Sequence, residues 1–290
     1  MKHTVPAAPA ILVALAAVAV LAMTLASPVA SAAPGDKPAV APATPPAAPP
    51  ADKPAAPPPS ARVPTADELL TALDANMTFA TRTAKLKMTV VNGKRTRVFE
   101  IISYGRGEED AAMEYRAPAR EKGTRMLKLG DELWIYMPTI DRVQKISGHM
   151  LRQGMMGSDL SYEDMMASRE LRKRYTSKVT GDATVGGRPC WKLEMVATDK
   201  SVTYPRRETC VDKETMIAVE QKLFALSGML IKTWTMSAVQ TFEGGRRFPT
   251  KMVIRDHLRK GSETRIEMSG IRFGVALERE VFSLRWLERR

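Results

Sequence analysis

The stretch WIYMPTIDRVQKISGHMLRQGMMGSDLSYEDMM, residues 134–166, joins a strand pair, a glycine-containing loop and a helix start without interruption. At its beginning, aliphatic residues alternate with Trp134 and Tyr136, as expected for a β-strand with two different faces. Pro138 opens a turn, and residues 142–146 form a second short strand. The stretch therefore predicts a β-hairpin that continues through a loop into a helix.

The loop and the helix are rich in glycine and methionine. Ser147 and Gly148 end the second strand, and Gly157 loosens the loop that follows. Ser161, with Asp164 three residues later, is typical of a capping box and predicts a helix start. The loop and helix contain five methionines, Met150, Met155, Met156, Met165 and Met166. These side chains either fill gaps in an ordinary core or form a surface that adapts to variable apolar partners.

The N-terminus has the features of a secretory signal peptide. Lys2 and His3 precede an apolar run at residues 11–26, and residues 30–32 read Ala-Ser-Ala. A basic start, a short apolar run and a small-x-small site favour export and cleavage. The run is shorter than the roughly 20 residues of a membrane span, and its retention as an anchor is the alternative. We expect residues 1–32 to be a signal peptide.

Residues 33–64 consist almost entirely of alanine and proline, with 12 prolines among 32 residues. Such a composition cannot build a core and favours extended polyproline conformations. We therefore expect a disordered, semi-rigid linker that holds the following domain away from a membrane or a wall layer. A docking ligand for another protein is the alternative.

Residues 65–290 are enough for one domain with a sizeable core. Thr65, followed three residues later by Glu68, gives the spacing of a capping box and predicts an N-terminal helix. The rest is mainly strand-like. The strand-like runs are residues 84–91, 97–104, 111–116, 124–129, 133–137, 142–146, 175–179, 190–196, 206–211, 216–223, 230–242, 251–258 and 264–271.

The runs predict an antiparallel meander, because turn residues such as Asn92-Gly93 separate most of them. In one run, Trp191, Leu193 and Met195 alternate with charged residues, so we expect one face of the sheet to be buried and the other to be exposed to solvent. So large a sheet covers its apolar face by curling around the helices. The expected fold is mainly β with α: an incomplete antiparallel β-barrel of about 10–12 strands, closed by an N-terminal helix and a central lid helix.

Three motifs follow one another in this order: WIYMP at residues 134–138, RVQKISG at 142–148 and GSDLSYED at 157–164. Together with the order of helix, strands, loop with helix, and further strands, they resemble the LolA/LolB-like superfamily of outer-membrane lipoprotein-sorting proteins. The resemblance is strongest to the branch found alongside RND-type exporters. It covers nearly the whole of residues 65–290.

The resemblance implies a half-barrel with an apolar cavity that accepts acyl chains. Residues of the family motifs with expected structural roles are Pro138, Arg142, Ser147, Gly148, Gly157, Ser158, Asp159 and Asp164. The candidate cavity and lid residues are Trp134, Tyr136, Met155, Met156, Leu160, Tyr162, Met166 and Trp191. Which face of the strand lines the cavity stays open, because Trp134 and Tyr136 share one face and Ile135 and Met137 share the other.

The resemblance also implies a location and partners. We expect a soluble periplasmic monomer that binds acyl chains of lipids or lipoproteins. An inner-membrane RND-type exporter and an outer-membrane acceptor are the expected protein partners. Hydrophobic transfer would supply the affinity, at about 0.8 kcal/mol per buried methylene. No cofactor is expected.

The chain is basic, with a formal net charge of +12; loss of residues 1–32 removes only Lys2 and leaves +11. Export and the absence of a nucleic-acid-binding motif argue against nucleic acid as the partner. The basic residues are scattered, for example in KRTR at residues 94–97. They either form a solvated outer face or attract anionic headgroups or an acidic partner.

Both cysteines, Cys190 and Cys210, lie in the expected exported domain on neighbouring strand-like runs. In an oxidising compartment this arrangement favours one disulfide, and free buried thiols are the alternative. No CxxC motif is present, which argues against thiol redox catalysis.

The sequence contains no catalytic or metal-binding constellation. His149 and His257 lack the spacing of metal ligands, and Ser158 lacks the second glycine of a nucleophile elbow. We therefore expect no enzymatic activity and no metal. Three hypotheses follow: a lipid or lipoprotein carrier, a sensing module of the same fold that regulates another protein, and, with least support, a hydrolase that uses one of these histidines.

Overall fold

The computed structural model describes residues 62–166, 171–199 and 202–289. By its internal contacts the chain divides into two units, Met1–Pro58 and Pro59–Arg290, and every described residue belongs to the second unit. The expected signal peptide lies outside the described residues, as does the expected linker except for its last three residues.

One antiparallel sheet of thirteen strands forms the body of the domain, in the order β6-β5-β4-β3-β2-β1-β13-β12-β11-β10-β9-β8-β7. Every strand-like run of the sequence becomes a strand, so the sheet is one strand larger than the upper end of the expected range. The strands are β1 (Thr81–Asn92), β2 (Arg95–Arg106), β3 (Asp110–Ala117), β4 (Arg125–Leu129), β5 (Glu132–Met137), β6 (Arg142–Lys145), β7 (Tyr175–Val185), β8 (Arg188–Ala197), β9 (Arg206–Asp212), β10 (Ala218–Phe224), β11 (Leu230–Thr241), β12 (Arg247–Asp256) and β13 (Ser262–Phe273).

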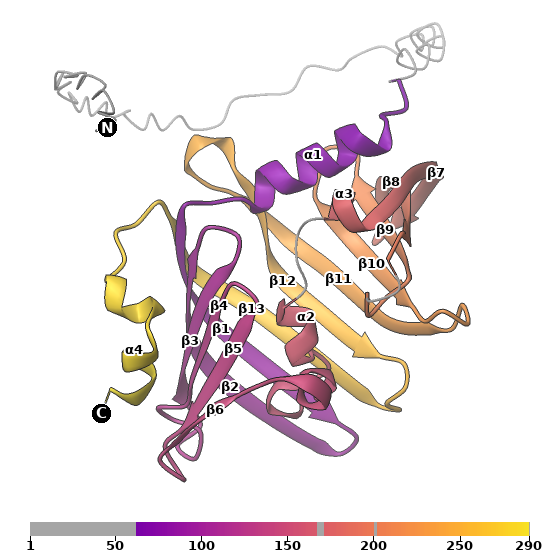
Figure 1. The fold of residues 1–290 in the computed structure, drawn as a ribbon. Coiled ribbons are helices and arrows are strands. Elements are labelled where there is room, and N and C mark those ends of the chain that lie inside the picture. Colours follow the sequence, from indigo (N-terminus) through magenta and orange to yellow (C-terminus); the bar gives the residue numbers. More distant parts are fainter. Residues whose placement is uncertain (1–61, 167–170, 200–201, 290) are drawn as a thin grey trace, which may run out of the picture. The chain divides into compact units, whose positions relative to one another are not determined.

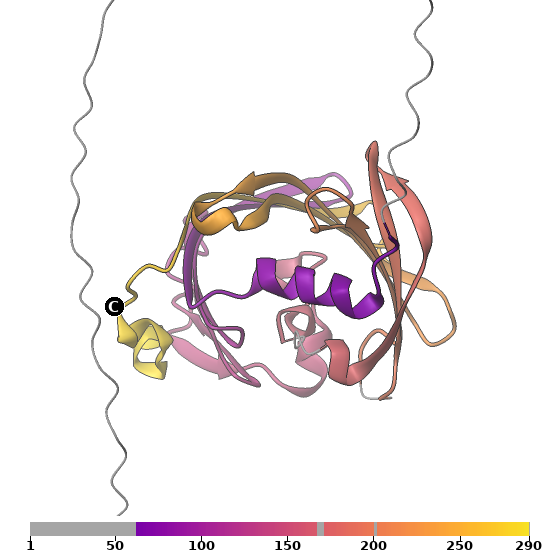
Figure 2. The ribbon, with the colours of Figure 1, turned by 90° about the horizontal axis from the view of Figure 1, so that it is seen from above.

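The sheet curves without closing, because β6 and β7 are its two edges. Figure 2 shows it wrapped around α1 and around the segment that contains α2, which confirms the predicted incomplete barrel. We call residues 148–166 the lid segment. Between the two edges the chain forms the 3₁₀ helices η1 (Gly148–Arg152) and η2 (Met155–Gly157) and the short helices α2 (Tyr162–Met166) and α3 (Leu171–Arg174).

Helix α1 (Ala66–Met77) lies across the concave side of the sheet (Figures 1 and 2). The predicted capping box is present: Glu68 N donates to Thr65 Oγ1 at 3.2 Å, and Thr65 N donates to Glu68 Oε2 at 2.7 Å. Leu69 and Leu70 are buried against a cluster from the far strands that includes Trp191. Neither α1 nor any other helix within the described residues combines the length and the hydropathy that a membrane crossing requires.

The C-terminal residues cover part of the outer face of the sheet. They form η4 (Arg279–Phe282) and α4 (Leu284–Glu288), which the sequence analysis did not predict. Ser283 caps α4 by accepting a hydrogen bond from Trp286 N at 3.3 Å. The guanidinium of Arg125 donates to the carbonyl oxygens of Trp286 and Leu287 at 3.3 and 3.2 Å, so it satisfies carbonyls that the short helix leaves open.

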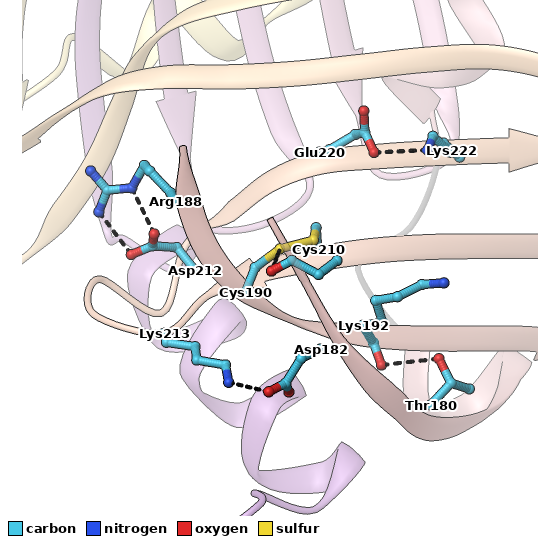
Figure 3. The surroundings of a disulfide bond; sticks show 11 residues. Thr180, Asp182, Arg188, Cys190, Lys192, Cys210, Asp212, Lys213, Glu220 and Lys222 are labelled. Carbon is cyan, nitrogen blue, oxygen red and sulfur yellow. Dashed lines mark hydrogen bonds and ion pairs between the residues drawn. A yellow bond between two sulfur atoms is a disulfide. The ribbon is translucent and has the colours of Figure 1, made fainter. Parts of the chain in front are cut away.

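Cys190 on β8 and Cys210 on β9 form a disulfide, as predicted, with 5.5 Å between their Cα atoms. Side chains alternate across a strand, so Cys190 lies on the face of β8 opposite to Trp191. Beside the bridge, Arg188 Nε lies 2.6 Å from Asp212 Oδ2 (Figure 3). Hydrogen bonds from Arg188 hold the pKa of Asp212 well below its usual range. The disulfide therefore joins β8 and β9 on the outer face of the sheet and does not occupy the concave face.

Replacement of both cysteines by alanine should lower the free energy of unfolding by about 3 kcal/mol, because the bridge closes a 20-residue loop in the unfolded chain. Urea denaturation followed by circular dichroism measures the change. Wild-type protein in dithiothreitol should have the same denaturation midpoint as the double variant. Equal midpoints for wild type and variant without reductant would contradict a stabilising role for the bridge.

Candidate functional site

The lid segment fills the concave side of the sheet. Met155, Leu160 and Tyr162 are buried against residues of β1, β2, β4, β5, β12 and β13. Burial raises the pKa of the Tyr162 hydroxyl, so this group stays neutral at physiological pH. The interface between lid segment and sheet is therefore apolar and well packed.

Methionine dominates this interface. Eleven of the eighteen methionines of the chain belong to it, three of them buried and eight partly buried. Methionine is unbranched and has three rotatable side-chain bonds, so a methionine-rich contact can repack around a new shape at low cost. The eleven are Met88, Met113, Met126, Met137, Met150, Met155, Met156, Met165, Met166, Met252 and Met268.

Asp159, in the middle of the lid segment, is anchored to β13. Its carboxylate accepts hydrogen bonds from Ser262 Oγ at 2.5 Å and from Thr264 Oγ1 at 2.8 Å. Its own backbone N–H donates to Thr264 Oγ1 at 2.8 Å. The side chain of Asp159 is 1% exposed and lies 3.8 Å from the guanidinium of Arg259. Because a buried carboxylate is costly without such partners, these contacts fix the position of the loop.

Asp164, in α2, is anchored to β11, which is separated from β13 by β12 alone. Its carboxylate accepts from Lys232 Nζ on β11 at 2.5 Å and from the Tyr204 hydroxyl at 2.7 Å. The side chains of Lys232 and Asp164 are 7% and 1% exposed, so this ion pair is buried. Burial raises the pKa of Tyr204, and the charge of Asp164 raises it further, so the hydroxyl remains a donor.

Asp164 also completes the predicted capping box of α2. Ser161 N donates to Asp164 Oδ2 at 2.8 Å, and Asp164 N donates to Ser161 Oγ at 3.1 Å. One carboxylate therefore starts the helix and ties it to the sheet.

The backbone at Gly154 and Gly157 of the lid segment lies too close to neighbouring atoms for a side chain. A Cβ at Gly154 would lie 2.1 Å from the carbonyl oxygen of Ser158. Gly157 has a φ of +75°, and a Cβ there would lie 2.6 Å from the guanidinium of Arg97. That guanidinium donates to the carbonyl oxygen of Met156. Glycine is thus required at both positions by the close approach of neighbouring atoms.

A pocket of about 330 Å³ lies beside α2 on the concave side. Phe79, Met165, Met166 and Trp234 supply its apolar lining, and Asp164 is among its polar residues. This volume is at the lower end of the range for small-ligand pockets.

The structure separates the candidate cavity residues into three groups. Met155, Met156, Leu160, Tyr162 and Met166 lie between the lid segment and the sheet. Trp191 belongs to a second core cluster, which also contains Leu69 and Leu70 of α1.

Trp134 and Tyr136 point to the outer face of β5, where they pack in the cluster of Phe282 and Trp286. The concave face of this strand belongs to Leu133 and Ile135. The two aromatic residues are therefore wall residues that face away from the lid.

Four of the remaining motif residues lie in or beside the edge strand β6. Pro138 is in the turn between β5 and β6, Arg142 begins β6, and Ser147 precedes η1, which begins at Gly148. Ser158 is buried, and its hydroxyl bonds to the backbone of Leu160. Within residues 62–166, 171–199 and 202–289, no group of three or more acidic, histidine or cysteine side chains could hold a metal ion.

The partners of the two aspartates were not found from the sequence. Lys232, Ser262 and Thr264 lie on the buried face of strands that otherwise read as alternating. One sequence signal could have found them: a polar residue at a position where the alternation of the strand predicts an apolar one. Thr264, two residues before Ile266, is an example.

Residues 107–289, more than half of the chain, match the model of a protein family described as an uncharacterized protein. No curated protein sequence matches the chain.

Three solved structures share the fold. A DUF1329 family protein from Desulfovibrio piger is 24% identical, with a TM-score of 0.70 over 77% of this chain and 97% of that one. A structure from Vibrio parahaemolyticus, assigned as an outer membrane lipoprotein-sorting protein domain, is 22% identical. Its TM-score is 0.67 over 77% of this chain and all of that one. A LolA superfamily protein from Nitrosomonas europaea is 20% identical, with a TM-score of 0.62 over the same shares.

At these identities the solved structures establish the shared fold, and the family match covers most of the domain. The protein therefore belongs to the matched family and shares the fold of these three solved structures.

Proposed function

We propose that this protein is a periplasmic carrier that holds acyl chains of lipids or lipoproteins between its lid segment and the concave face of its sheet. The observation that carries the proposal is the methionine-rich contact between these two parts. Such a contact suits replacement of the lid by acyl chains, because both present flexible, apolar surfaces to the wall. The lipoprotein-sorting assignment of the related domain from Vibrio parahaemolyticus supports the same cargo class.

The free energy gained by burial of an acyl chain can offset the loss of a buried ion pair when the lid segment opens. Burial of a dozen methylenes contributes about 10 kcal/mol, at about 0.8 kcal/mol each. Disruption of the buried pair of Asp164 and Lys232 costs about 3–5 kcal/mol if one charge stays buried, and less if both reach water. Burial of an acyl chain of this length therefore outweighs the loss of this ion pair, whereas a ligand without a long apolar part does not.

The carrier would exchange its cargo with a membrane or with a partner protein. We propose an RND-type exporter of the inner membrane and an outer-membrane acceptor as partners, in keeping with the motifs of residues 134–164. A periplasmic module that senses lipid or mislocalised lipoprotein is the alternative function. Loaded protein that passes its lipid to acceptor vesicles supports the carrier, and loaded protein that retains its lipid there supports the sensor.

Lipid mass spectrometry of protein purified from its native periplasm tests the proposal directly. Stoichiometric lipid or lipoprotein is the expected result. Protein that arrives empty and takes up no fluorescent fatty acid would refute both the carrier and the sensor.

A charge on the concave face should reduce uptake. Met252→Glu should weaken binding of a fluorescent fatty acid by about tenfold or more, because its charge would be buried beside the acyl chain. Val253→Glu is the matched control, since it is the next residue of β12 and faces the other way. Fluorescence titration measures both affinities. Equal affinities would place the acyl chain elsewhere.

Weaker anchoring of the lid should speed its opening. Asp159→Asn removes the charge that Ser262 and Thr264 stabilise, so trypsin cleavage after Arg152 in η1 should accelerate by about tenfold or more. Uptake of the fluorescent fatty acid should also be faster. Asp182→Asn, which breaks an exposed ion pair with Lys213, is the control. Unchanged cleavage and uptake in Asp159→Asn would show that this carboxylate does not hold the lid.

We propose that the protein is not an enzyme. His149 and His257 are both exposed, and His257 Nε2 lies 2.8 Å from Thr233 Oγ1. Replacement of both histidines by alanine should leave acyl uptake and delivery unchanged in vesicle assays. Complete loss of function would revive the hydrolase hypothesis.

A further inference from the structure

Three hairpin turns at one end of the sheet form a distinct surface, which we call the tip surface. They are the β1–β2 turn at residues 92–95, the β10–β11 turn at residues 225–229 and the β12–β13 turn at residues 257–261. Figure 1 shows these turns at the end of the strands opposite to α1.

Backbone hydrogen bonds hold the three turns side by side. Gly93 N donates to the carbonyl oxygen of Gly261 at 3.0 Å, which joins the β1–β2 turn to the β12–β13 turn. His257 N donates to the carbonyl oxygen of Ile231 at 2.8 Å, which joins the β12–β13 turn to the start of β11. The tip surface is therefore continuous.

Large apolar side chains protrude from two of these turns. Leu226 is 89% exposed, Leu258 is 60% exposed and Met229 is 52% exposed. None of the three belongs to a core cluster of the domain. They lie at the ends of projecting hairpins, so they suit insertion into a soft surface.

Unpaired positive charge lies in the β1–β2 and β12–β13 turns. Lys94, Arg95 and Lys260 are exposed, and none of them makes an ion pair within the residues that the structure describes. Of the nearby acids, Glu263 is already paired with two arginines at 2.5 Å. Asp256 accepts a hydrogen bond from a backbone N–H of its own turn at 2.9 Å and keeps its negative charge, so the three cations outnumber it.

We propose that the tip surface docks onto a bilayer that contains anionic lipids. Protruding apolar side chains would enter the boundary between headgroups and acyl chains, and the cations would lie among the headgroup phosphates. The occupant is identified by two features together: apolar groups on projecting turns, and unpaired cations in the same or the neighbouring turns. The proposal goes beyond the carrier function, because the tip surface lies outside the concavity.

The tip surface is also joined to the lid. In the β12–β13 turn, Arg259 Nη1 donates to the carbonyl oxygen of Ser158 at 2.9 Å, and Nη2 donates to that of Gly157 at 3.2 Å. Arg97, two residues beyond the β1–β2 turn, donates to the carbonyl oxygen of Met156. Docking would thus bring the anchored end of the lid to the bilayer, where cargo is exchanged if the carrier function holds.

Vesicle flotation with the exported full chain, purified from a periplasmic extract, tests the proposal. Vesicles of phosphatidylcholine with phosphatidylglycerol should bind the protein, and vesicles of phosphatidylcholine alone should bind it much less. Leu226→Ser with Leu258→Ser should weaken binding to the anionic vesicles by about tenfold or more. Leu284→Ser is the matched control, because Leu284 is 50% exposed on α4, away from the tips.

A second pair of variants tests the charges. Lys94→Ser with Arg95→Ser should weaken binding to the anionic vesicles by about tenfold and reduce its salt dependence. Lys85→Ser with Lys87→Ser, two exposed cations of β1 outside the turn, should have little effect. Circular dichroism should be unchanged in all four variants.

Three results would overturn the proposal. They are absence of binding to anionic vesicles, equal binding to both kinds of vesicle, and binding that the leucine variants leave unchanged. If the leucine variants instead lose only the capture of a protein partner, the tip surface is a protein interface. Uptake of a fluorescent fatty acid in detergent-free solution is measured separately, so failure of docking is distinguishable from failure of the carrier function.

Discussion

Two buried carboxylates hold the lid segment inside the curved sheet, and the architecture of the concave side depends on them. Asp159 is bonded to β13 and Asp164 to β11, so the segment is fixed at two points on the wall that it covers. Buried carboxylates specify position sharply, because each is costly unless its particular partners are met. The apolar side chains around them need only fill the space.

In the carrier that we propose, the lid segment must be well placed and also removable, and this division of labour suits both needs. The methionines of the interface contribute burial with little geometric preference, so another apolar surface can take the place of the lid. The polar contacts have the opposite property, since only the closed arrangement satisfies them. A segment held mainly by interlocking branched side chains would close as firmly but would accept fewer shapes of ligand.

The two capping boxes were read correctly from the sequence, and the partners of the two buried aspartates were not. The capping boxes of Thr65 with Glu68 and of Ser161 with Asp164 each involve residues three apart. The bond between Asp159 and Ser262 spans 103 residues and leaves no local pattern.

The inward face of β5 was undecidable for a different reason. Both of its faces are apolar, because the C-terminal residues cover the outer face of the sheet over Trp134 and Tyr136. Alternation identifies a buried face only where the other face meets water.

The open sheet has one more consequence. Its edges, β6 and β7, share no ladder of hydrogen bonds, and the chain between them is the lid segment with α3. The edges can therefore spread apart without the loss of a single strand pairing, while the connecting chain limits how far they go. A closed barrel has a capacity fixed by its strand number and stagger. In the carrier that we propose, the interior can instead widen to fit the cargo.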